Sequence, residues 1–188
     1  MASLSAMLPY ESAGIFEQPK QKFAFKVPRV VSDQKGKFEQ DDWFKKVTRA
    51  SEARYTGNRE RPMEERRAKF QSDLKTNGRT ELALTQNGLN LILEFDISPN
   101  GYTGRAPDVD FAKEPGMVHL TSKSIILNGV CVRWRGVFNL ESLNGTGSIE
   151  FDDEMAQEED NRLRQQMEYY NQRIRDFNDR QKYKREAD

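Results

Sequence analysis

The spacing of hydrophobic residues predicts two helices in the first part of the chain. Over residues 33–56 apolar side chains such as Trp43 and Val47 recur at steps of three and four, which is typical of one helix with a buried face. A second helix begins at Pro62, where the missing N–H group costs nothing. It ends at Gly78, since glycine adopts the positive φ that closes many helices.

After Gly78 the period of the apolar positions changes to two, which predicts strands. Apolar runs flank three Asn-Gly pairs, at residues 87–88, 128–129 and 144–145. Asn-Gly favours a two-residue hairpin turn because both central residues of that turn need positive φ. The pattern predicts strands at 81–85, 89–95, 118–127 and 130–134, and a third hairpin within 138–149. Three hairpins indicate an antiparallel meander or small barrel, with a loop at 98–115.

From Asp152 onward one long helical pattern follows. Its apolar residues step by four, three, four and three, as in a heptad seam: Leu163, Met167, Tyr170, Ile174 and Phe177. The favoured interpretation is that this stripe packs on the chain's own barrel. The alternative is a coiled-coil adaptor acting through residues 155–184. Residues 1–27 show no steady period, which predicts a disordered N-terminal extension.

Composition fits one soluble domain with tails. The chain has 188 residues, 30 basic and 30 acidic, with mean hydropathy −0.89. No apolar run approaches the ~20 residues of a membrane helix, and no signal peptide is evident. Zero net charge argues against a protein that coats DNA or a membrane. The net charge is zero because charged segments cancel. Residues 26–79 carry 15 bases and nine acids, whereas the segments 80–151 and 152–188 are each net −3.

Reactive side chains are scarce. Cys131 is the single cysteine and His119 the single histidine, so neither a zinc site of these ligands nor an internal disulfide is possible. Cys131 lies between two valines and is expected to be a buried thiol in a reducing compartment. The sequence has no phosphate-binding loop of the GxxxxGK type. We therefore expect no enzyme activity, metal, cofactor or small-molecule substrate.

A small barrel also raises the possibility of single-stranded nucleic-acid binding through stacking aromatics. Arg133-Trp134-Arg135 is the best candidate for such a site. Period two, however, places Trp134 on one strand face and the two arginines on the other. The pattern favours Trp134 in the core and solvated arginines, which leaves protein binding as the default function.

Several runs carry a resemblance to a known family. They include Pro28-Arg29-Val30-Val31, Tyr55-Thr56-Gly57 and, most specifically, the seven residues 126–132, Ile-Leu-Asn-Gly-Val-Cys-Val. Over about residues 28–180 the chain resembles the beta subunit of core-binding factor, the partner of Runt-domain transcription factors. The resemblance implies an α+β fold: a partly open, OB-like antiparallel β-barrel with flanking N-terminal helices and a long C-terminal helix. It implies a family domain at 28–165 and a helical extension with a charged tail at 166–188.

The resemblance also implies a function. Members of that family heterodimerise with a Runt domain and allosterically raise its DNA affinity without contacting DNA. The chain is then expected in the nucleus with its partner and in the cytoplasm alone, with no membrane contact.

The family's partner-binding positions correspond here to Arg29, Val30, Gly88, Asn90, Leu127 and Asn128. A family glutamine is replaced by Glu94, so that position is left out. Asparagine suits such a role because its amide both donates and accepts hydrogen bonds.

Overall fold

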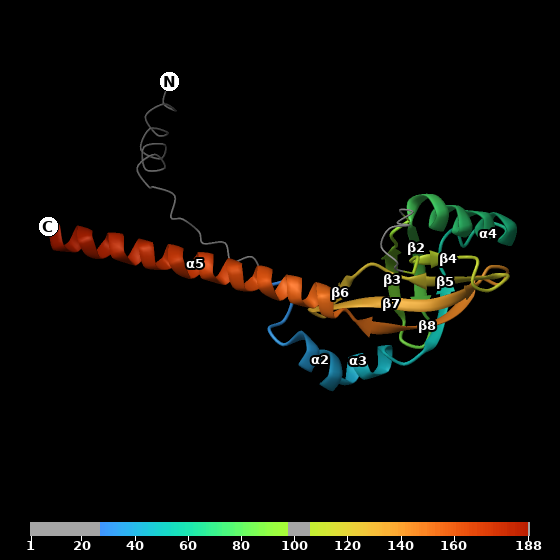
Figure 1. Ribbon diagram of the computed structural model, residues 1–188, viewed down its shortest axis with the longest axis horizontal. Coiled ribbons are helices and arrows are strands. Elements are labelled where there is room, and N and C mark those ends of the chain that lie inside the picture. The colour runs from blue at the N-terminus through green and yellow to red at the C-terminus, as the bar shows by residue number, and fades with distance from the viewer. Residues whose placement is uncertain (1–26, 98–105, 188) are drawn as a thin grey trace, which may run out of the picture.

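The computed structural model describes residues 27–97 and 106–187. Eight strands form one antiparallel sheet in the order β3-β2-β1-β8-β7-β5-β4, with β6 also paired to β7. The strands are β1 (Ser51–Tyr55), β2 (Arg79–Leu84), β3 (Leu89–Glu94), β4 (Val109–Asp110), β5 (Met117–Thr121), β6 (Ile125–Leu127), β7 (Val130–Asn139) and β8 (Asn144–Phe151). The helices are α2 (Gln34–Gln40), α3 (Asp42–Val47), α4 (Met63–Ser72) and α5 (Asp153–Ala187), and a π-helical turn η1 (Asp73–Asn77) extends α4. Figure 1 shows these helices around the curled sheet.

The sheet closes only in part. The amide of Lys123, between β5 and β6, donates to the carbonyl of Glu94 at the end of β3, at 2.7 Å. This bond joins the β3 edge to the other side of the sheet without a continuous ladder between them. The α+β class and the partly open barrel that the family resemblance implied are therefore confirmed.

The single helix predicted over 33–56 is wrong. Asp41 ends α2 and caps α3, because its backbone is extended and its side chain accepts a hydrogen bond from the Trp43 amide at 2.7 Å. Residues 51–55 form β1, which pairs with both β2 and β8. Their alternate side chains are buried in the core, a pattern that the helical period over the same residues had concealed.

The second predicted helix is confirmed. Glu64 and Glu65 lie in the first turn of α4, where acidic side chains complement the helix dipole. After the π-helical turn, Gly78 caps the helix with φ of 58°. A Cβ at this position would lie 2.6 Å from the Phe95 carbonyl oxygen, so both conformation and space require glycine.

The predicted two-residue turn at 128–129 is confirmed, whereas at 87–88 the hairpin is right but its turn is a four-residue loop in which Asn87 does not have positive φ. Asn128 and Gly129 both have positive φ, 47° and 77°, and join β6 to β7. Residues 85–88 join β2 to β3. The predicted strand 118–127 is interrupted between β5 and β6. Residues 121–125 lie opposite residues 132–135 of β7, so five residues face four, and the extra residue forms a bulge.

The third predicted turn is misplaced. Asn144 and Gly145 lie at the start of β8, not in a turn. The chain reverses before them, where the Asn139 side chain accepts hydrogen bonds from the amides of Glu141 and Ser142. Leu143 takes φ of 57° with its side chain buried, so burial of an apolar residue overrides the local Asn-Gly preference.

The core fills the inner face of the curled sheet. Trp134 lies at its centre beside Phe138, with ring centroids 5.8 Å apart. The prediction that Trp134 belongs to the core is confirmed. The prediction that the two flanking arginines are solvated is right for Arg135, which is exposed, and wrong for Arg133. The Arg133 side chain is only 19% exposed and lies 2.7 Å from the carboxylate of Asp152, the residue that precedes α5.

The predicted C-terminal helix is confirmed as α5, which runs away from the sheet (Figure 1). Leu163 packs against the small cluster of Val30, Cys131 and Ala156. Further along, the prediction that the stripe packs on the barrel is wrong, because Met167, Ile174 and Phe177 are 53%, 37% and 46% exposed. The helix leaves the sheet before those residues could reach it.

Two further sequence predictions concern residues that lie partly outside the described ranges. The N-terminal extension lies outside them except for Val27, as do residues 98–105 of the predicted loop. The rest of that loop contains the short strand β4. The domain boundary at residue 165 stays a prediction.

Candidate functional site

An N-terminal arm, residues 27–33, lies along the β6–β7 hairpin. The Val31 amide donates to the Gly129 carbonyl at 2.9 Å. Val30 is buried with Cys131 and Ala156, so its side chain anchors the arm between the hairpin and α5. Arg29 precedes this anchor and is exposed. The family resemblance gave both Arg29 and Val30 as partner-binding positions. In the structure only Arg29 is exposed, whereas the side chain of Val30 is buried.

Leu127 and Asn128 form the tip of the same hairpin. Leu127 is half-buried against the core, and Asn128 is exposed. The Asn128 backbone carbonyl accepts a hydrogen bond from the Lys37 ammonium at 2.7 Å. Positive φ at Asn128 explains part of the preference for asparagine here, since this residue tolerates the left-handed region. The tip is thus held from α2 through its main chain while the amide side chain faces outward.

Gly88 and Asn90 lie on the β2–β3 hairpin. Gly88 has φ of 64° and open space where a Cβ would be. Asn90 pairs with Ala83 across the ladder and points away from the core. On the same outer face of β3 follows Ile92, which is exposed although apolar. An exposed amide beside an exposed isoleucine on a sheet edge is suited to contact with another protein.

The β2–β3 hairpin and the β6–β7 hairpin lie on the two sides of the opening that the partial closure of the sheet leaves. Five successive antiparallel pairings lead from β6 to β3, so these strands run in opposite directions on either side of the opening. The bond between Lys123 and Glu94 fixes their relative register at one point. The β2–β3 hairpin, with Gly88 and Asn90, therefore borders one side of the opening, and the β6–β7 hairpin with the arm along it borders the other.

The sequence analysis did not identify Gln34, whose side chain links the elements that surround the arm. Gln34 is buried, and its carbonyl accepts a hydrogen bond from the Cys131 amide at 2.9 Å. Its amide group donates to the Ala156 carbonyl at 3.2 Å and to Asp160 at 2.8 Å. One side chain thereby links α2, β7 and α5. A glutamine after a helix cap gives no local indication of such burial.

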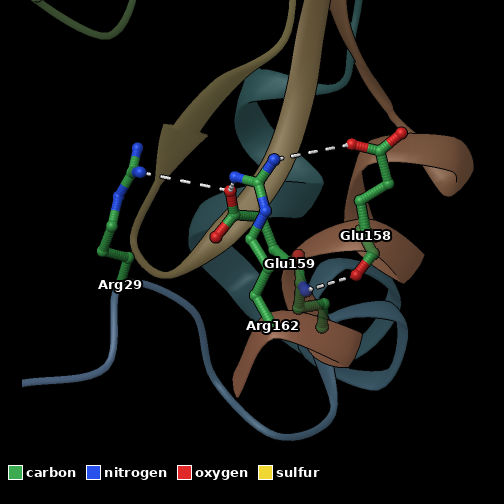
Figure 2. Close-up of polar contacts among 6 residues, drawn as sticks. Arg29, Glu158, Glu159 and Arg162 are labelled. Carbon is green, nitrogen blue, oxygen red and sulfur yellow. Dashed lines mark hydrogen bonds and ion pairs between the residues drawn. The ribbon is translucent and has the colours of Figure 1, made fainter. Parts of the chain in front are cut away.

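Basic side chains pair with some of the acidic ones at the start of α5. Asp152 pairs with Arg133, and Glu159 lies 2.9 Å from Arg162 and 4.0 Å from Arg29. Figure 2 shows Arg29 reaching toward Glu159 from the arm, with Arg162 on the helix beside it. Two of the carboxylates that lie close to the hairpin, those of Asp152 and Glu159, are therefore paired with cations.

Burial raises the pKa of the Cys131 thiol to about 11, and the nearby carboxylate of Glu159 adds to the effect. At pH 8 about one folded thiol in a thousand would then be ionised. Because the thiolate is the reactive form, we expect Cys131 to react with Ellman's reagent no faster than the chain unfolds. Rapid labelling of the folded chain would contradict this, and the chain in guanidinium provides the control.

The same shift has a consequence for stability. The unfolded thiol loses its proton near its ordinary pKa of 9.0, whereas the folded thiol keeps it to about 11. The folded state thus binds more protons in this window, so this group makes the free energy of unfolding fall as pH rises from about 9 to about 11.

The chemistry available at this surface is that of recognition. Within residues 27–97 and 106–187 no three His, Cys, Asp or Glu side chains are grouped so as to hold a metal ion. Over the same ranges no helix combines the length and apolarity of a membrane span. The surface offers a guanidinium and two outward amides, which suit hydrogen bonding to a protein partner, and a partly exposed leucine, which suits apolar contact.

Comparisons with known proteins agree with this description. A family model described as "Core binding factor beta subunit" matches residues 27–188. The chain is 48% identical over 178 residues to "Protein big brother" of Drosophila melanogaster, covering 95% of this chain and 82% of that protein. It is also 48% identical over 174 residues to "Protein brother" of the same organism, covering 92% and 80%.

Proposed function

Because the chain belongs to the core-binding factor beta subunit family, a family of non-enzymatic transcription regulatory subunits that partner Runt-domain proteins, we propose that it heterodimerises with a Runt domain and allosterically raises its DNA affinity. The observation that supports this most directly is that five of the six family-matching residues lie on the segments that border the opening of the sheet. Arg29, Leu127 and Asn128 lie on one side, and Gly88 and Asn90 lie on the other.

Enhancement without DNA contact fits the charge of the molecule. The chain is neutral in total, and residues 80–151, which hold most of the sheet, are net acidic. Such a surface gains little from phosphate groups. We infer that the effect on DNA passes through the Runt domain, whose DNA-competent form this chain would bind more tightly. Such coupling is reciprocal, so DNA must tighten the heterodimer by the same factor.

A mobility-shift titration tests the proposal. A Runt domain is titrated on its DNA site with and without the chain. We expect the chain to lower the Kd for DNA by a factor of about 5–150, the usual range of allosteric coupling. By itself the chain should shift neither duplex nor single-stranded DNA at about 100 mM salt. The absence of enhancement, or a shift by the chain alone, would contradict the proposal.

The two alternative functions are separated by related experiments. A shift of single-stranded DNA by the chain alone would favour the nucleic-acid-binding barrel. For the adaptor, the chain is shortened to about residue 165, which removes most of the seam on α5 and retains the turns that contact the arm. Undiminished Runt binding by the shortened chain would exclude the part of α5 beyond residue 165, and with it the adaptor, as the main binding element.

Location follows from the same proposal. A subunit that binds a nuclear transcription factor is expected in the nucleus when the partner is present and in the cytoplasm otherwise. Imaging the chain in cells with and without a co-expressed Runt-domain protein measures this directly. A distribution that ignores the partner would contradict it.

A further inference from the structure

Arg29 is an exposed residue of the arm, and the backbone is held immediately after it. The next residue, Val30, is buried, and Val31 is hydrogen-bonded to the hairpin, so the backbone is fixed from there on. The arm has no regular secondary structure to direct the long Arg29 side chain. The Arg29 guanidinium lies 4.0 Å from the carboxylate of Glu159, a residue of α5 (Figure 2).

Glu159 is suited to this task by its burial. Its side chain is 9% exposed, whereas that of Arg29 is 71% exposed. A buried carboxylate stays charged only where cations or hydrogen bonds compensate it. Arg162 supplies one such contact at 2.9 Å to the same oxygen, Oε1, that faces Arg29. The carboxylate is thus held in place by its own helix and presents a fixed negative charge to the arm.

We propose that Glu159 is a positioning residue for partner binding, and that the second turn of α5 therefore belongs to the recognition surface through Arg29. This inference rests on the proposed function. Ordering one long side chain at an interface corresponds to about a two- to twelvefold change in Kd. A guanidinium already directed before binding avoids part of that loss.

The neighbouring residue provides a matched control. Glu158 also pairs with Arg162, at 3.9 Å, but its side chain is half exposed. Its ion pair is with Arg162 and not with Arg29 (Figure 2). Glu159→Gln retains the shape and removes the charge. We expect it to weaken binding to a Runt domain about two- to fivefold by isothermal titration calorimetry, the range of a partly exposed ion pair. Glu158→Gln should leave the affinity unchanged.

A double-mutant cycle shows whether Glu159 acts through Arg29. In an Arg29→Ala background we expect Glu159→Gln to have no further effect on Kd. An equal loss in both backgrounds would mean that Glu159 supports the fold or contacts the partner directly, and would overturn the proposal. Wild-type affinity for the Glu159→Gln chain would overturn it as well.

A measurement without the partner keeps this inference separate from the proposed function. The order parameter of the Arg29 Nε–H group in the free chain reports how firmly its side chain is held. We expect it to fall in Glu159→Gln and to stay unchanged in Glu158→Gln. Equal values in wild type and Glu159→Gln would overturn the inference even if the heterodimer forms. If no heterodimer forms while Arg29 loses order in Glu159→Gln, the proposed function fails and the pairing stands.

Discussion

Replacing Asn90 and Asn128 together should weaken the heterodimer about 30-fold or more while leaving the fold intact. Both side chains are exposed and flank the opening of the sheet. In a desolvated interface each truncation leaves partner groups unpaired, at about 1–3 kcal/mol each. The residues lie on different hairpins, so their effects should add. Calorimetry or the mobility shift described above measures the loss.

The choice of substitution at Asn128 decides how cleanly this result can be interpreted. Asn128 has φ of 47°, where alanine would cost about 1–2 kcal/mol of stability by itself. Asn128→Gly removes the same amide without that strain. We therefore expect Asn90→Ala with Asn128→Gly to keep the melting temperature within about 2 °C, because neither lost side chain is buried.

A third asparagine supplies the control for these substitutions. Asn144 is exposed and begins β8, at the opposite end of the β7–β8 ladder from Asn128. Asn144→Ala should retain full affinity. Wild-type affinity in the double variant would show that the partner binds elsewhere, and a large fall in melting temperature would show that the two residues are structural.

Gln34→Ala should be among the most destabilising polar substitutions in the chain. It leaves the buried Cys131 amide without its acceptor and opens a cavity between α2, β7 and α5. The expected loss is about 2–4 kcal/mol of unfolding free energy. For a chain of this size that is a fall of about 5–15 °C in melting temperature.

Two variants sharpen the Gln34 prediction. Glu39→Ala changes an exposed residue of the same helix and should be nearly neutral. Gln34→Glu keeps the acceptor for Cys131 but loses the donors and places a second charge beside Asp160, so we expect it to be destabilising too. A loss below about 1 kcal/mol in Gln34→Ala would mean that water replaces the side chain without cost.

Local chemistry was enough to predict much of this fold. Pro62 and Gly78 bound the second helix, Asn128 and Gly129 form the hairpin turn, and the long polar pattern after Asp152 gives α5. Each of these depends on residues within one or two turns of one another. The family resemblance supplied the six candidate residues as well, although it did not say which are exposed.

Only the tertiary structure decided the features that depend on distant residues. Residues 51–55 become a strand because β2 and β8 offer pairing on both sides, and the third turn moves because Leu143 is buried. Gln34 finds its partners 97 to 126 positions away, and Glu159 reaches Arg29 across a similar distance in sequence. Local preferences amount to about 1 kcal/mol per residue, and burial of a large side chain or of a polar network outweighs them. The sequence by itself therefore determined the elements that local chemistry fixes, and the resemblance supplied the candidate residues. Packing decided the remaining elements and how those residues are held.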